Sequence, residues 1–106
     1  MDRIYRALAD PTRRRILRML AEGERTQSDL VAALGVSQPA VVKHVRALRE
    51  AGLIHERREG RWCLYSLNEE TAARAYAELR REWEELLGRR LADLKRYLES
   101  PKEDER

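Results

Sequence analysis

Several features that would assign this chain to a broad functional class are missing from its sequence. Its single cysteine, Cys63, cannot form an internal disulfide, and one cysteine is too few for a zinc site built on thiolate ligands. No apolar run approaches the length that crosses a membrane, and the N-terminus lacks the apolar segment of a signal peptide. We therefore expect a cytoplasmic protein.

The sequence also lacks the residue patterns from which enzymes are built. It has no paired acid and base, no nucleophile placed beside a base, and no glycine-rich phosphate loop. Its two histidines, His44 and His55, are not clustered with each other or with Cys63. Isolated residues of these types are more often structural than members of a metal site. We predict that the protein is not an enzyme and that it binds no metal or other cofactor.

Charged residues, by contrast, are abundant and unevenly distributed. They make up 39% of the 106 residues, with a net charge of +3. Residues 1–68 contain 13 Lys/Arg and 8 Asp/Glu, a balance of +5, whereas residues 69–106 contain 9 and 11, a balance of −2. A basic front half and a slightly acidic, helix-patterned back half suggest separate binding and assembly surfaces. The length fits one domain, predicted over residues 1–98, with a flexible tail at 99–106.

The segment from Gly35 to Leu53 carries the signals of a helix with two unlike faces. Ser37 is an N-cap candidate because its hydroxyl can accept from the free N–H groups of the first turn. Gly52 can supply the left-handed position that ends the helix. Apolar residues recur at steps of four and three, at Val41, Val45 and Leu48. This spacing predicts that they face the core.

The opposite face of this helix is polar except for one residue. Gln38, Lys43 and Arg46 accompany Val42 there. In one interpretation, Val42 belongs to a broad core stripe. In the other, the segment is a DNA-recognition helix, in which Val42 touches a thymine methyl group while Gln38 and Lys43 contact base edges.

The residues before Gly35 predict three shorter helices. The first spans Asp2 to Ala9. The second spans Thr12 to about Glu22 with Asp10 as its cap, and the third begins at Thr26 and ends at Gly35. A short helix, a tight turn containing glycine and a capped second helix form a helix-turn-helix pattern.

Three consecutive arginines, Arg13 to Arg15, lie near the start of the second helix. Such a cluster can simply be solvated. Positive charges near a helix start nevertheless oppose the macrodipole by a few tenths of a kcal/mol each. This small cost favours a phosphate partner, and Arg13 is our candidate for that contact.

Two strands follow the helix that ends near Leu53. Ile54–Glu59 and Arg61–Leu67 alternate in polarity around Glu59-Gly60, which predicts a β-hairpin. Arginines gather near its tip, at positions 57, 58 and 61. A basic hairpin in this place can contact DNA phosphates or enter the minor groove.

The remaining residues predict one long helix that begins after Asn68. Its apolar positions continue at helical spacing to Leu98, and the helix is about 45 Å long if it reaches that residue. Gly88 falls where the apolar stripe shifts by one position, and we expect a bend or a local stutter there. So long an apolar face predicts packing against a second copy, together with the first helix. The expected dimer contacts are Ile4, Tyr5, Leu8, Tyr76, Leu79, Trp83, Leu86 and Leu87.

The order of these elements and several local phrases resemble the ArsR-type winged-helix repressors of bacteria. The phrases are residues 6–15 (RALADPTRRR), 37–53, 57–61 (RREGR) and 64–67 (LYSL). The resemblance extends through Leu98. It implies a homodimer built from the first and last helices, which binds an operator with two-fold symmetry. By position in the motif, base-reading contacts fall on Gln38, Pro39, Val42 and Lys43.

The metal-sensing motifs of that family are absent from this sequence. Members that bind metals through thiolates have paired cysteines in the helix before the recognition helix, where this chain has residues 26–30 (TQSDL). Members that sense zinc place His and carboxylate ligands on the last helix, and residues 69–98 contain no His. The resemblance therefore implies DNA binding and dimerisation without metal sensing.

We predict a mainly α fold with a small β-hairpin, namely a winged helix-turn-helix with a long C-terminal dimerisation helix. The predicted function is sequence-specific repression of transcription at an inverted repeat, with double-stranded DNA and a second copy of the chain as partners. His44 is expected to meet a phosphate or neighbouring backbone. Contacts with phosphates or through the hairpin are assigned to Arg13, Ser37, His44, Arg46, Arg57, Arg58 and Arg61.

Two alternatives stay open. The winged helix could bind a protein partner rather than DNA, although such an interface would favour aromatic residues over the polar and basic ones present. The repressor could also respond to oxidation through Cys63. Cys63 shares its predicted strand face with Tyr65 and Leu67, which favours a small core residue, because thiolate chemistry needs exposure and a lowered pKa.

Overall fold

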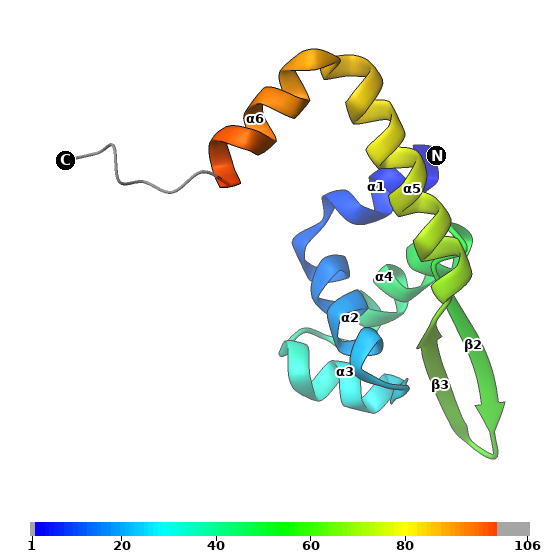
Figure 1. The fold of residues 1–106 in the computed structure, drawn as a ribbon. Helices are drawn as coiled ribbons and strands as arrows, with labels where there is room; N and C mark the ends of the chain where they lie inside the picture. The colour runs from blue at the N-terminus through cyan, green and yellow to red at the C-terminus, as the bar shows by residue number, and fades with distance from the viewer. Residues whose placement is uncertain (1, 100–106) are drawn as a thin grey trace. The chain divides into compact units, whose positions relative to one another are not determined.

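The computed structural model describes residues 2–99, which form two compact units. The first unit ends at Ala75 and the second begins at Tyr76. The elements in chain order are α1 (Asp2–Ala9), α2 (Pro11–Glu22), β1 (Arg25–Thr26), α3 (Gln27–Leu34), α4 (Gln38–Glu50), β2 (Ile54–Glu59), β3 (Trp62–Leu67), α5 (Glu69–Leu87) and α6 (Arg89–Glu99) (Figure 1). Helix α5 starts in the first unit and ends in the second, and we describe the two units separately.

Local side-chain caps set the starts of α2, α3 and α4, as predicted. The Asp10 carboxylate accepts hydrogen bonds from the N–H groups of Thr12 (2.8 Å) and Arg13 (3.2 Å) at the start of α2. At the start of α3, Thr26 and Asp29 form a reciprocal capping box, with both bonds 3.0 Å long. Ser37 accepts from the N–H of Ala40 (3.2 Å) and caps α4. Helices α3 and α4, joined by the turn at residues 35–37, therefore form the predicted helix-turn-helix.

The core of the first unit contains the three α4 residues predicted to face it, Val41, Val45 and Leu48. Its buried members come from every helix and strand except β1: Ala7, Ile16, Leu20, Leu30, Leu34, Val41, Val45, Leu48, Leu53, Ile54, Tyr65 and Ala75. Val41 and Leu48 of α4 are completely inaccessible to solvent, whereas Val42 between them is 36% exposed. Val42 therefore lies outside the buried stripe, and the broad-stripe interpretation of this residue is wrong.

The strands form an antiparallel sheet in the order β1–β3–β2. The predicted hairpin of β2 and β3 is confirmed, and it extends beyond the helices of the first unit (Figure 1). Its turn lies at Gly60 and Arg61, so β3 begins at Trp62, one residue later than predicted. Strand β1 was not predicted, because two residues are too few to display an alternating pattern.

One polar residue of the sheet lies in the core. Tyr65 of β3 is buried, and its hydroxyl donates to Oε1 of Gln27 on α3 (3.4 Å). Burial, together with the nearby carboxylate of Glu56, raises the pKa of Tyr65 to about 12. The phenol therefore stays neutral at physiological pH and joins β3 to α3.

The last predicted helix is divided in two. Gly88 adopts a left-handed conformation (φ +52°), and its N–H donates to the carbonyl of Glu84 (2.8 Å), which ends α5 at Leu87. Glycine adopts this conformation without the penalty that a Cβ atom imposes. The chain changes direction there and continues as α6 (Figure 1). The expected bend at Gly88 is confirmed, and the helix, whose continuity past Gly88 the sequence left open, is broken there.

Two further sequence predictions concern the chain as a whole. None of the helices in the part of the chain that the structure describes is both long enough and apolar enough to cross a bilayer. The predicted flexible tail, residues 99–106, lies outside the described residues apart from Glu99, which ends α6.

Candidate DNA-binding surface

The outer face of α4 brings together the residues assigned to base reading. Gln38 and Pro39 lie in the first turn, and Val42 and Lys43 follow in the second. All four side chains are exposed, as is Arg46 one turn further on. The Ser37 cap fixes the start of α4. Polar and basic side chains therefore surround the exposed Val42 on this face.

Arg13 at the start of α2 is held by groups of its own protomer. Its Nε donates to Nδ1 of His44 on α4 (3.2 Å), and one terminal nitrogen donates to the carbonyl of Arg6 (3.2 Å). His44 thus contacts a side chain, whereas the sequence predicts contact with a phosphate or neighbouring backbone. The neighbouring arginines also donate to carbonyls, Arg14 to Leu8 (2.6 Å) and Arg15 to Ala33 (3.4 Å).

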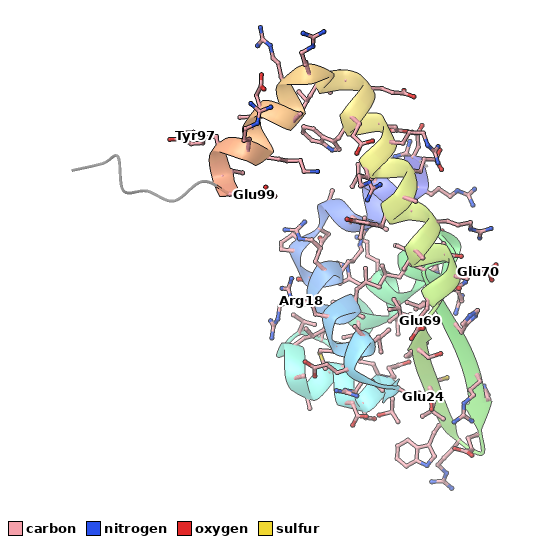
Figure 2. The ribbon with its side chains drawn as sticks, in the orientation of Figure 1. Arg18, Glu24, Glu69, Glu70, Tyr97 and Glu99 are labelled. Atoms are coloured by element: carbon pink, nitrogen blue, oxygen red, sulfur yellow. The ribbon has the colours of Figure 1, made fainter. Side chains whose placement is uncertain are left out.

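The three hairpin arginines differ in what they contact. Arg57 donates two hydrogen bonds to the Glu24 carboxylate (2.8 and 3.0 Å), which lies beside the hairpin (Figure 2), and it also lies 3.7 Å from the Glu59 carboxylate. The Arg57 guanidinium lowers the pKa of Glu24, and Glu24 in turn raises the pKa of Arg57. Arg58 and Arg61 are exposed and make no hydrogen bond or ion pair within residues 2–99. Their charges are therefore available to an anionic partner, while that of Arg57 is compensated.

A second ion pair joins the hairpin to α4. Arg49, in the last turn of the helix, pairs with Glu56 of β2. Together with Arg57–Glu24, this contact ties β2 both to α4 and to the turn before β1. Sequence reasoning missed both pairs. Glu24 and Arg57 are 33 positions apart, and Arg49 and Glu56 lie on different elements, so no local pattern joins either pair.

A shallow hollow of about 270 Å³ separates the start of α4 from the hairpin. Gln38, Arg61 and Trp62 line it, together with Gln27 and Ser28 of α3 and Cys63 of β3. The indole of Trp62 is 53% exposed, and sequence reasoning had treated this residue only as part of a strand. An exposed tryptophan next to the assigned base-reading residues is the signal that could have drawn attention to it.

The structure also shows the surroundings of Cys63 and of the side chains that could bind a metal ion. Cys63 is half-buried, packs against the core, and its thiol lies 3.9 Å from a carboxylate oxygen of Glu56. Its predicted role as a small core residue therefore fits the packing. Within residues 2–99, no three His, Cys, Asp or Glu side chains come together in a way that could hold a metal ion.

The residues assigned to the dimer interface fall into two groups. On α1, Ile4 and Leu8 are half-buried against the core of the first unit, and Tyr5 is half-buried as well. In the second unit, apolar side chains are exposed, with Tyr76 at 65% and Leu86 at 76%. Of the other assigned residues there, Trp83 is exposed and Leu79 and Leu87 are half-buried.

Comparisons with known proteins agree with this arrangement. The family model of the bacterial regulatory proteins of the arsR family matches residues 10–56, from the cap of α2 to β2. The transcriptional repressor SdpR of Bacillus subtilis is 37% identical over 68 residues, which are 64% of this chain and 76% of that protein.

Two solved structures share the fold. The crystal structure of a possible transcriptional regulator for arsenical resistance has a TM-score of 0.74 and 36% identity, with coverage of 88% of this chain and 96% of that one. The homodimeric winged helix-turn-helix DNA-binding domain of a possible ArsR-family regulator from Mycobacterium bovis has a TM-score of 0.65 and 33% identity, with coverage of 79% and 78%. The chain is thus a winged helix-turn-helix protein and belongs to the arsR family of bacterial regulatory proteins.

Proposed function

We propose that the protein is a homodimeric transcriptional repressor that binds an inverted-repeat operator and does not sense metal. The observation that carries the proposal is the exposed outer face of α4, which presents Gln38, Val42 and Lys43 beside a basic hairpin. Two similar proteins support it: SdpR of Bacillus subtilis is a transcriptional repressor, and the Mycobacterium bovis domain is a homodimeric DNA-binding domain.

Helix α4 reads the bases in this proposal. Gln suits the N6/N7 edge of adenine, Lys suits O6/N7 of guanine, and Val42 suits a thymine methyl group. Pro39 packs against the groove wall at the start of the helix. Phosphate contacts fall on Ser37, Arg46, Arg58 and Arg61, and Arg13 and His44 contribute as a hydrogen-bonded pair. Arg57 serves mainly to hold the hairpin against Glu24.

The second unit joins two copies of the chain. Its apolar side chains, Tyr76, Trp83 and Leu86 among them, are half to three-quarters exposed. Exposed apolar groups concentrated in one short region of a small protein mark an interaction site. A second copy is the partner that two-fold symmetric DNA recognition requires, because two recognition helices must enter successive major grooves about 34 Å apart.

The proposal leaves no role for a metal effector, since the ligand motifs of metal-sensing members are absent from the sequence. Regulation through the Cys63 thiol is disfavoured, because the thiol is half-buried against the core. A purely protein-binding winged helix is disfavoured because the face of α4 is polar and basic around Val42.

Selection of bound fragments from random duplex DNA, followed by footprinting of the enriched sequence, tests the proposal. We expect an inverted repeat with half-sites about 10–10.5 base pairs apart, or a multiple of that distance. Sedimentation at micromolar concentration should give about twice the 12.5 kDa mass of one chain. A monomer in sedimentation, or no enrichment of any sequence, contradicts the proposal.

A further inference from the structure

Helices α1, α2 and α4 of the first unit surround a hollow of about 210 Å³. Two small residues, Ala7 of α1 and Ala47 of α4, allow the helices to approach closely at this place, and Ala7 is buried. The other side chains that line the hollow are Arg3, Arg6, Arg13 and Glu50.

We call this space the α1–α4 hollow, and its lining carries a positive net charge. Three guanidinium groups and one carboxylate give a net charge of +2. The side chains of Arg3 and Arg6 are exposed and make no hydrogen bond or ion pair within residues 2–99. Arg13 is held in place by His44 and by the carbonyl of Arg6, so its orientation is set before any ligand arrives. Arginine forks of this kind bind phosphate oxygens in a bidentate manner.

The hollow also continues the proposed DNA-reading face of α4. Lys43, Ala47 and Glu50 follow one another at steps of four and three, so they share one side of the helix. Ala47 lies about 6 Å along the helix from Lys43, at 1.5 Å per residue. A duplex whose bases meet Lys43 therefore brings one of its sugar-phosphate strands towards this flank of α4, while the hairpin occupies the opposite flank through Arg49 and Glu56.

We propose that the α1–α4 hollow is a binding site for a backbone phosphate of the operator, with Arg3 and Arg6 as the phosphate-binding groups and Arg13 as a preset third. This inference rests on the proposed DNA binding and adds a third contact surface to helix α4 and the hairpin. Neither Arg3 nor Arg6 belonged to the contacts assigned from the sequence. The same chemistry would recognise free phosphate, and the experiment must separate the two sources.

The test compares the salt dependence of DNA binding by the full-length wild type with that of Arg3→Ala/Arg6→Ala. Log K falls as log salt rises, and loss of one phosphate contact should make this fall less steep by about 1 unit per protomer. The affinities for operator and random DNA should decrease by the same factor. Arg18→Ala is the matched control, because Arg18 is exposed and projects from α2 outside the hollow (Figure 2). This control should keep the wild-type slope, and Arg6→Lys should keep most of it because the charge remains.

The outcomes separate the two proposals. If the wild type binds no duplex, both the proposed function and the phosphate site fall. If the wild type binds with a steep salt dependence that the double variant retains, only the phosphate site falls. A titration with inorganic phosphate, followed through the arginine side-chain NMR signals, measures whether the hollow also binds free phosphate. Phosphate binding lost in the double variant, together with an unchanged DNA slope, would identify a free-anion site and overturn the assignment to DNA. A circular dichroism melt verifies that each variant is folded.

Discussion

The two units of this chain differ in where their apolar side chains lie. In the first unit, residues such as Ile16, Leu30 and Leu48 are completely inaccessible, and the surface of α4 is polar and basic. In the second unit, no described side chain is buried, and Leu86 on α5 is exposed. Tyr97 on α6 is exposed as well (Figure 2). The first unit satisfies its own core and leaves a charged surface for a ligand. The second leaves apolar area uncovered, as expected of a segment that is completed by association.

Core substitutions should sharpen this difference most. Leu48→Ala removes the three carbon atoms beyond Cβ at a fully buried position and should destabilise the protein by about 2–5 kcal/mol. Leu86→Ala, at a position 76% exposed, should leave the fold of one protomer almost unchanged and, by weakening association, make the unfolding midpoint less dependent on protein concentration. Urea denaturation at two protein concentrations measures both effects. Equal decreases in the free energy of unfolding for the two variants would contradict the contrast between a buried core in the first unit and exposed apolar side chains in the second.

A second prediction places base reading in the first unit. Gln38→Ala should cost roughly 1–3 kcal/mol on operator DNA and little on random DNA. Arg58→Ala should weaken both DNAs alike and reduce the salt dependence by about 2 units per dimer. Fluorescence anisotropy titrations at several salt concentrations give both quantities. The assignment fails if Arg58→Ala selectively removes operator preference while Gln38→Ala weakens both DNAs equally.

A third prediction concerns the stability of the first unit in acid, which should depend on the Asp10 carboxylate that caps α2. Burial opposes ionisation of Asp10, but hydrogen bonds from the Arg13 and Thr12 N–H groups outweigh it, so the pKa of Asp10 lies below its usual 3.8. A lowered pKa means that the stabilisation is complete above about pH 4 and is lost as the pH falls through the lowered value. Asp10→Ala should therefore cost about 1 kcal/mol near pH 7 and progressively less in acid.

Asp10→Asn provides the control for this experiment, because the amide oxygen can still cap the helix but does not titrate. Thermal unfolding from pH 2 to pH 7 compares the three proteins. A deficit of Asp10→Ala that stays constant down to pH 2 would show that the ionised carboxylate contributes nothing beyond the neutral cap.

The smallest effect is expected from metal ions, which should act on neither unit. The sequence lacks the ligand motifs on which metal-sensing relatives depend, and the described residues offer no cluster of three ligands. Chelator treatment, and then stoichiometric zinc or cadmium, should leave operator affinity unchanged. A large and reversible change at one metal ion per chain would reveal a site that this account lacks.

The sequence predicted those parts of the fold that depend on local chemistry. Asp10, Thr26 and Ser37 cap the helices as expected, because a cap involves residues only two or three positions apart. The inward face of α4 was also predictable from helical spacing, and the exposure of Val42 excludes it from the core stripe. Its contact with a thymine methyl group stays a prediction.

Long-range pairing could not be predicted in the same way. Arg57 was assigned to phosphates, yet it binds Glu24, which is distant in sequence and close only after the hairpin folds. Arg3 and Arg6 acquire their setting from Ala47 of α4, so their hollow exists only in the tertiary structure. The bend at Gly88 was predictable from the glycine and the shift of the apolar stripe, whereas its left-handed conformation is seen only in the structure.

In our proposal the first unit reads DNA and the second unit couples two copies, and binding to a half-site distinguishes these two roles. The measurement is the ratio of affinities for a full inverted repeat and for one half-site, in the wild type and in Trp83→Glu, which adds a charge to the exposed apolar surface of α5. Linkage of two sites should give the wild type a ratio of about 10²–10⁴. In Trp83→Glu we expect the ratio to fall towards 1 while the half-site affinity stays the same. A variant that keeps the wild-type ratio, or that loses half-site binding as well, would contradict the separation of reading from coupling.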